Sequence, residues 1–272
     1  MTPPTSGAAG AVLVSATTAA KAAPYVAALT AAGIPSESIR VVASADLFHA
    51  GASTAAAQAA PAAATIAADL AAGAAGLVLS GGADVDPRRY GEETLPGAGV
   101  EPLPERDALE WELLAAARER RLPVWAICRG FQVLNVFFGG SLWQDLPLQR
   151  PTAVVHDPDE TPHDQPVHAL RVLAPETPLG ARLAAAGPAP RVNSRHHQGV
   201  KRLGDGLLAV AAAEDGLIEA AVLGAGAATT ATADGDGWWV RGVEWHPENL
   251  LALPEQLALW HDFAAALRAR RD

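Results

Sequence analysis

The chain has 272 residues and a formal net charge of −10; half of its residues are hydrophobic and 18% are charged. This apolar content excludes a disordered chain, and the acidic balance argues against nucleic acid or an anionic membrane as the main partner. Cys128 is the single cysteine, which excludes an internal disulfide and a multi-cysteine metal site. We therefore expect a globular protein of the reducing cytoplasm.

No run of residues has the apolar character of a membrane-spanning helix. The apolar stretch at 11–14 lacks a preceding basic residue, because the first one is Lys21, so it predicts a strand and not a secretory signal. The sequence contains no internal repeat and no clear domain boundary. We expect a flexible tail at residues 1–10 and a single domain at 11–272.

Short apolar runs alternate with helical patterns along the chain. The helix predicted at 106–121 has acidic residues early and arginines late, as the helix dipole favours. Strands that alternate with helices indicate a mostly parallel sheet with helices on both faces. The proline-rich segment 147–190 gives no clear pattern. The expected strands are 11–15, 38–42, 77–79, 123–127, 207–213, 217–222 and 238–245, and the expected helices are 22–32, 50–73, 106–121, 130–138 and 254–270.

Cys128 lies between an apolar strand and a helical pattern, with Ala126 and Gly130 on either side. A strand, a sharp turn and a helix with small neighbours form a nucleophile elbow, which lifts the turn residue above the sheet edge. A cysteine at a helix N-terminus is also expected to have a lowered pKa. A lone cysteine is otherwise most often a buried core residue, and this context favours the nucleophile.

A thiol nucleophile needs a base, and His246 directly follows the last predicted strand. In a parallel sheet this places it at the same edge as the elbow. Glu248 comes two residues later, where its carboxylate can return to the imidazole and fix its tautomer. The competing interpretation is a helix start, with Pro247 in the first turn.

Two further segments carry polar groups suited to a site. The Gly81-Gly82 pair ends a predicted strand and allows backbone N–H groups to face an oxyanion. The following Asp84 and Asp86 lack the spacing of a calcium loop. His196 and His197 are adjacent, so on a strand they point in opposite directions and do not form a zinc site together. We expect no metal and no cofactor.

These motifs together resemble the class I glutamine amidotransferase-like superfamily, and most closely its γ-glutamyl-γ-aminobutyrate hydrolase family of cysteine hydrolases. The resemblance spans about residues 11 to 265. The matching segments, in the family's order, are 80–92, Arg106-Asp107 with Glu110, 127–136, 139–146, 192–198, 213–220 and 242–248.

The resemblance implies a flavodoxin-like α/β fold and hydrolysis of a γ-glutamyl amide to glutamate and the free amine through a cysteine thioester. It implies Cys128 as the nucleophile, His246 as the base and Glu248 as the partner of that base. The residues that it implies for the oxyanion hole are Gly81, Gly82 and Arg129, and those for substrate binding are Gln132, Asn193, Ser194, His196 and His197.

Three residues depart from the family pattern: Ala126 and Ser80 replace a glycine and a proline, and Glu244 replaces a glutamine. We expect the positions of Ser80 and Glu244 to be peripheral.

Two other functions stay open: a glutaminase subunit that delivers ammonia to a synthetase partner, and a non-catalytic binding protein on the same scaffold. The amine of the substrate is not determined by the sequence. The expected partner is a small γ-glutamyl substrate, and the apolar faces are compatible with a homodimer that nothing in the sequence selects.

Overall fold

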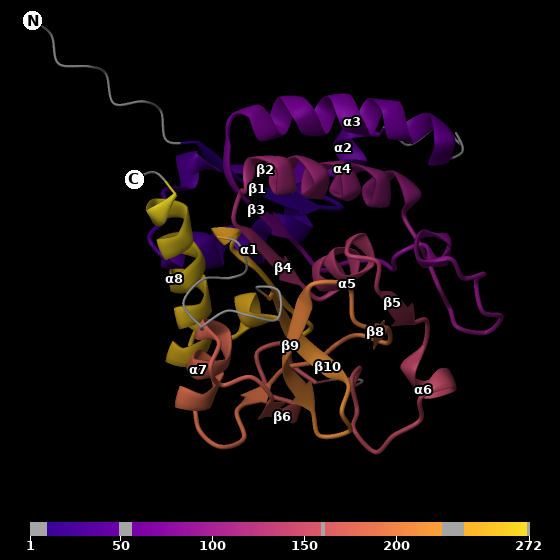
Figure 1. Ribbon diagram of the computed structural model, residues 1–272, viewed down its shortest axis with the longest axis vertical. Helices are drawn as coiled ribbons and strands as arrows, with labels where there is room; N and C mark the ends of the chain where they lie inside the picture. Colours follow the sequence, from indigo (N-terminus) through magenta and orange to yellow (C-terminus); the bar gives the residue numbers. More distant parts are fainter. Residues whose placement is uncertain (1–9, 49–55, 159–160, 225–236, 271–272) are drawn as a thin grey trace, which may run out of the picture.

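Five parallel strands form one half of a single continuous sheet (Figure 1). The computed structural model describes residues 10–48, 56–158, 161–224 and 237–270, without the side chains of 56–60. Each neighbouring pair among these five strands is parallel, as the alternation of strands and helices predicts. In spatial order they are β2 (Ile39–Ala43), β1 (Ala11–Ala16), β3 (Ala74–Leu79), β4 (Val124–Ile127) and β11 (Val240–Val243).

The other half of the sheet is antiparallel and continues beyond β11. It contains β10 (Ile218–Leu223), β9 (Leu207–Ala213), β6 (His168–Val172) and β7 (Arg191–Val192), with β5 (Ser141–Trp143) and β8 (Gly199–Arg202) paired at its side. The strands β5 to β8 were not predicted. β6 lies in the proline-rich segment 147–190, which gives no clear pattern, and β5, β7 and β8 have only two to four residues each.

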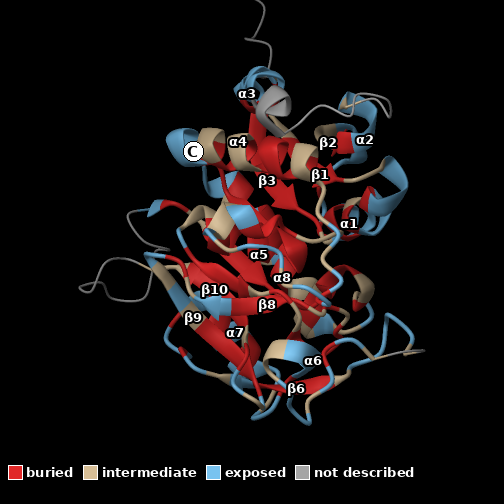
Figure 2. Ribbon diagram, turned by 90° about the vertical axis from the view of Figure 1, so that its right-hand side faces the viewer, coloured by how far each residue is buried: buried red, intermediate tan, exposed pale blue. Residues whose placement is uncertain are grey.

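Helices cover both faces of the parallel half, as expected. On one face α1 (Ala19–Ala31) and α8 (Pro254–Ala269) pack on the buried Trp125 and Ile127 of β4. On the other face lie α3 (Ala56–Ala72), α4 (Pro104–Arg120) and α5 (Arg129–Phe137), which share a core with Val124 and Ala126. Successive residues of a strand point to opposite faces, so β4 is buried on both sides. The neighbouring β3 is buried along its whole length and is drawn in red in Figure 2.

Shorter helices join these elements. They are α2 (Ser44–Leu47), α6 (Leu146–Gln149) and α7 (Pro178–Ala185), with 3₁₀ turns at Ser36–Ser38, Pro87–Tyr90 and Pro247–Asn249. The expected helix at 50–73 is α3, and part of its predicted range, 50–55, lies outside the described residues, as does most of the expected N-terminal tail. None of the described helices is long and apolar enough to cross a membrane.

The order of the strands decides where the site forms. β4 lies between β3 and β11, and all three run in the same direction. The carboxyl ends of neighbouring parallel strands meet at one edge of a sheet, where ligands bind in open α/β folds. The residues that follow these strands, Ser80, Cys128 and Glu244, therefore begin three adjoining loops, although they are far apart in the sequence.

Candidate active site

Cys128 occupies the sharp turn that the sequence predicts. Its backbone has φ 52° and ψ −116° at the N-terminus of α5, a conformation that L-residues seldom adopt and that costs about 1–3 kcal/mol. Its N–H donates to the carbonyl of Val243 at 2.8 Å, and its own carbonyl accepts from the N–H of Gln132 at 3.0 Å. A side chain at Gly130 would overlap the carbonyl of Leu79, so the elbow needs glycine there.

His246 is held at its backbone and at its ring. Its N–H donates to Oδ1 of Asn193 at 2.9 Å, and its carbonyl accepts from Nδ2 of Asn193 at 3.0 Å. Its Nδ1 lies 2.6 Å from Oε1 of the buried Glu248. These contacts fix both the position and the orientation of the imidazole.

Glu248, and not Arg195, determines which ring nitrogen of His246 carries the proton. Its Nη2 lies 3.0 Å from Nδ1 of His246 and 3.4 Å from Oε1 of Glu248. A guanidinium only donates, so Nδ1 cannot accept from Arg195 and also donate to Glu248. Because the contact with the carboxylate is the shorter one, we infer that Nδ1 carries a proton and donates it to Glu248 in a hydrogen bond. Nε2 is buried without a hydrogen-bond partner in the described part of the chain, and can accept a proton.

Gly81 marks the space that Cys128 and His246 share. A Cβ at this glycine would lie 2.9 Å from Cε1 of His246 and 3.6 Å from Cβ of Cys128. The two side chains therefore border the same small volume at the sheet edge. Cys128 is 6% exposed, so the thiol is nearly enclosed.

The expected lowering of the Cys128 pKa is wrong. Burial raises the pKa of the thiol, and this effect outweighs a hydrogen bond from the backbone of Arg129. The helix terminus stabilises a thiolate less than the enclosed site destabilises it. The resting thiol is therefore neutral, and it needs a neighbouring base to become a nucleophile.

The expectation that Ser80 and Glu244 are peripheral is also wrong, since both are fully buried at the site. Burial, and next the charge of Glu219, raise the pKa of Glu244 well above its ordinary value. A neutral carboxyl resembles an amide, and Glu244 accepts a hydrogen bond from Nε2 of Gln132 at 2.7 Å. The proposed substrate contact Gln132 thus already has a protein partner.

Arg106 fixes the glycine turn, a role that the sequence did not reveal. Its Nη2 donates to the carbonyls of Ser80 and Gly81 at 3.0 and 3.1 Å, and its Nε donates to Glu110 at 2.9 Å. A side chain at Gly82, where φ is +152°, would collide with this guanidinium. The spacing of Arg106 and Glu110, one helical turn apart, was the available signal.

Two neighbours of the elbow complete this framework. Arg129 forms buried ion pairs with Glu110 and Asp107, which tie α5 to α4. Tyr25 of α1 accepts a hydrogen bond from the N–H of Gly81 at 2.9 Å, so this expected oxyanion donor already has a partner. Nothing in the sequence around Tyr25 indicated a role at the site.

The other expected substrate contacts have protein partners of their own. Ser194 donates from Oγ to the carbonyl of His156 at 2.5 Å. His196 is buried, its Nδ1 contacts the carbonyl of Gln198 at 2.7 Å, and burial lowers its pKa to about 4. His197 lies between Asp84 and Asp145, at 3.1 and 3.2 Å. The hydrogen bond to Asp84 is the main reason that its pKa is raised to about 9. The two adjacent histidines face different partners, as expected.

Residues 29–248 match the family described as Peptidase C26. The chain belongs to the peptidase C26 family. Peptidases hydrolyse amide bonds, so the family supports an amide hydrolase. "Putative glutamine amidotransferase-like protein YvdE" of Lactococcus lactis subsp. lactis is 39% identical over 175 residues, 63% of this chain and 65% of that protein. "Gamma-glutamyl-gamma-aminobutyrate hydrolase PuuD" of Escherichia coli is 36% identical over 181 residues, 64% of this chain and 63% of that protein.

A solved structure supports the fold at lower sequence identity. A "putative gmp synthase subunit a protein" from Thermoplasma acidophilum has a TM-score of 0.57 and 13% identity, and the match covers 96% of both chains. This likeness supports the flavodoxin-like α/β fold of the protein described here. The chain spans just under two thirds of the length of the two curated relatives named above.

Proposed function

We propose that this protein hydrolyses γ-glutamyl amides, such as γ-glutamyl-γ-aminobutyrate or a related γ-glutamyl amine, to glutamate and the free amine. The carrying observation is that Cys128, on a strained elbow, shares the space beside Gly81 with a histidine bonded to Glu248 at 2.6 Å. A nucleophile, a base and a group that orients the base are the components of covalent amide hydrolysis. The names of the γ-glutamyl-γ-aminobutyrate hydrolases among the relatives support the substrate class.

In the proposed first half-reaction, Nε2 of His246 takes the thiol proton while the Cys128 sulfur attacks the γ-carbonyl carbon. The carbonyl oxygen becomes an oxyanion, for which we propose the N–H groups of Gly82 and Arg129 as donors. When the C–N bond breaks, the protonated His246 gives its proton to the departing amine, and a γ-glutamyl thioester remains. The transfer starts from a neutral thiol, in agreement with the raised pKa of Cys128.

In the second half-reaction His246 takes a proton from water as that water attacks the thioester carbonyl. The C–S bond breaks, glutamate leaves, and the sulfur recovers the proton from His246. Glu248 keeps Nδ1 protonated and stabilises the imidazolium that forms in each half. Water is the one further reactant that balances these steps.

A pocket of about 520 Å³ lies beside the residues that hold the base, and we propose that it admits the substrate. Its lining includes Asn193 and Arg195, which both contact His246, and His163. Arg195 is partly exposed, and a guanidinium binds carboxylates through paired hydrogen bonds. We propose that Arg195 pairs with a carboxylate of the substrate.

The test is release of glutamate by the purified chain alone, with a panel of γ-glutamyl amides and with glutamine. We expect turnover of the amides, loss of about 10³-fold or more in Cys128→Ala, and an unchanged melting temperature in that variant. A glutamine-analogue electrophile should label Cys128. Unchanged turnover in Cys128→Ala would refute the proposal.

The same assay separates the second candidate function. Several relatives carry names of glutamine amidotransferases, which favours a glutaminase that passes ammonia to a synthetase. A glutaminase of this kind would prefer glutamine over the amides and would need its partner for full activity. A non-catalytic binding protein would neither turn over any substrate nor react with the electrophile.

A further inference from the structure

Three histidines and a glutamate meet in the antiparallel half of the molecule, outside the thiol site. His156 lies in the loop before β6, His168 begins β6, His196 follows β7 and Glu219 lies in β10. All four side chains are buried. One nitrogen from each ring and a carboxylate oxygen lie within 4.8 Å of one another. Four chain segments thus direct ligand-type atoms to one buried point.

The distances from the Glu219 carboxylate oxygen to the three ring nitrogens are close to the distances between ligands of one small metal ion. Oε1 of Glu219 lies 3.4 Å from Nδ1 of His156, 3.6 Å from Nε2 of His168 and 3.7 Å from Nε2 of His196. In a tetrahedral zinc site with bonds of about 2.0–2.1 Å, the ligand atoms are about 3.3 Å apart. The four ligand atoms lie within 4.8 Å of one another, so binding of the ion would draw them closer together.

The inward-facing atoms of this cluster lack hydrogen-bond partners. Within the described residues, all three of these ring nitrogens and both oxygens of Glu219 are buried without a hydrogen-bond partner. Buried polar atoms are almost always paired, and each exception calls for an explanation such as an ion. Ring nitrogens and a carboxylate that face one point need protons or a cation between them, because lone pairs that face each other repel.

The outward-facing ring nitrogens are held by acceptors. Nε2 of His156 contacts the carboxylate of Asp215 at 3.2 Å, and Nδ1 of His196 contacts the carbonyl of Gln198 at 2.7 Å. Nδ1 of His168 contacts the carbonyl of Ala169 at 3.3 Å. Metal-binding histidines usually donate their second N–H to a carboxylate or a carbonyl, which leaves the inner nitrogen free for the metal.

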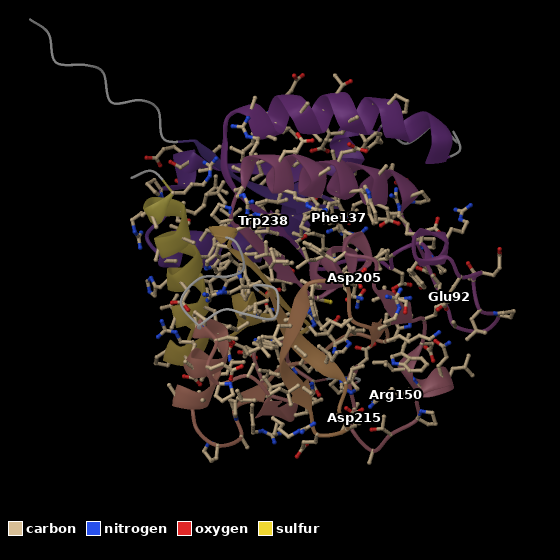
Figure 3. The ribbon with its side chains drawn as sticks, viewed as in Figure 1. Glu92, Phe137, Arg150, Asp205, Asp215 and Trp238 are labelled. Atoms are coloured by element: carbon tan, nitrogen blue, oxygen red, sulfur yellow. The ribbon has the colours of Figure 1, made fainter. Side chains whose placement is uncertain are left out.

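Asp215 is itself fixed from outside the cluster. Arg150 donates to its Oδ2 at 2.6 Å, and Figure 3 shows the two labelled side chains next to each other at the lower edge of the molecule. A pocket of about 280 Å³ is lined by His156 and His196 together with Arg150. Two of the four residues of the cluster therefore border this pocket.

We propose that His156, His168, His196 and Glu219 bind a structural divalent zinc ion in a closed, tetrahedral site. Imidazole nitrogens suit zinc, and four protein ligands leave no open position for catalysis. Among the histidines, the sequence expectation of no metal considered only the adjacent pair His196 and His197. The ligands from His156, His168 and Glu219 come from segments that only the fold brings together.

The ion would stabilise the loop that positions the catalytic base. His156 accepts hydrogen bonds at its carbonyl from the N–H of His196 and from Ser194. The same loop carries Asn193 and Arg195, which contact His246. A metal at His196 thus acts on His246 through the loop, and it touches neither the substrate nor the thiol.

Metal content of the full chain, purified without a histidine tag, tests the site directly. After loading with zinc and gel filtration, we expect about one zinc ion per chain, and at least a tenfold loss in Glu219→Gln and in His168→Gln. His197→Gln is the matched control, since it changes the histidine next to His196 but leaves the cluster intact. Cys128→Ser is the second control, because an ion at the thiol would be lost with the sulfur. Both controls should keep the ion.

Two measurements on the unmodified chain avoid the problem of a variant that fails to fold. Cobalt(II) in place of zinc should give the visible absorption bands of a tetrahedral site. Removal of the ion by a chelator should lower the melting temperature, and re-addition of zinc should restore it. A wild-type chain that retains less than about a tenth of an equivalent after loading would overturn the proposal. Equal zinc content in wild type and Glu219→Gln would overturn it as well.

Discussion

The substitution Gly81→Ala tests the arrangement of the candidate active site with one added methyl group. The new Cβ would lie 2.9 Å from Cε1 of His246 and 3.6 Å from Cβ of Cys128. Carbon atoms in contact prefer separations of about 3.5–4.0 Å, so the imidazole would have to move by about 0.6–1.1 Å. The methyl group would also enter the space where the substrate carbonyl has to lie beside the sulfur.

A displacement of about 1 Å at a catalytic group costs on the order of 10²-fold in rate, which corresponds to about 2.7 kcal/mol of transition-state stabilisation. We therefore expect kcat/KM of Gly81→Ala to fall by about 10²-fold for γ-glutamyl amides. Overpacking should lower the free energy of unfolding by about 1–3 kcal/mol. The assays are steady-state glutamate release and thermal unfolding of the same preparation.

Two glycines provide controls for Gly81→Ala. A Cβ at Gly73 meets no atom within 4 Å, and one at Gly199 lies 3.1 Å from the side chain of Leu217. Gly73→Ala should change neither activity nor stability, while Gly199→Ala should lower stability and keep most of the activity. If Gly81→Ala retains activity within about twofold, far less than the expected loss, the reasoning about the shared space is refuted.

Three further predictions follow from the surroundings of this site. Glu244→Gln should leave alkylation of Cys128 at pH 7 nearly unchanged, because the raised pKa of Glu244 already keeps its carboxyl neutral; a large gain in alkylation rate would show that this carboxyl is ionised. Asn193→Ala should lower the free energy of unfolding by about 1–3 kcal/mol, because it leaves the buried backbone of His246 unpaired. The value of kcat should fall in the same variant. An unchanged kcat would show that Asn193 does not position the base. His197→Gln should destabilise the chain at pH 6 but not near pH 10. The pKa of His197 is about 9 in the folded chain and 6.5 ordinarily. The stabilisation that the charged imidazole provides is therefore complete below pH 6.5 and is lost as the pH rises through 9. Solvent screening of this partly exposed ion pair limits the effect to about 1 kcal/mol, and denaturant unfolding of both proteins across this pH range measures it; an equal difference at both pH values would contradict the assignment.

The sequence alone determined the elements with strong local patterns. The parallel half of the sheet alternates buried strands with amphipathic helices, and its strands were predicted within a few residues. The elbow at Cys128 was visible because the strand, the cysteine and Gly130 are contiguous. His246 and Glu248 were visible for the same reason, since only Pro247 lies between them. Local patterns of this kind depend on chain periodicity and turn chemistry, which the sequence displays directly.

The tertiary structure decided everything that depends on distant segments. Burial by the surrounding elements, not the helix terminus, sets the direction of the Cys128 pKa, and the same burial makes Glu244 part of the site. Tyr25 and Arg106 reach the glycine turn from α1 and α4, at separations of 56 and 25 residues from Gly81. The residues of the cluster lie far apart in the sequence, without the short spacings that mark a metal site. They are His156, His168, His196 and Glu219. Desolvation and long-range contact exist only after the chain has folded, so no local pattern records them.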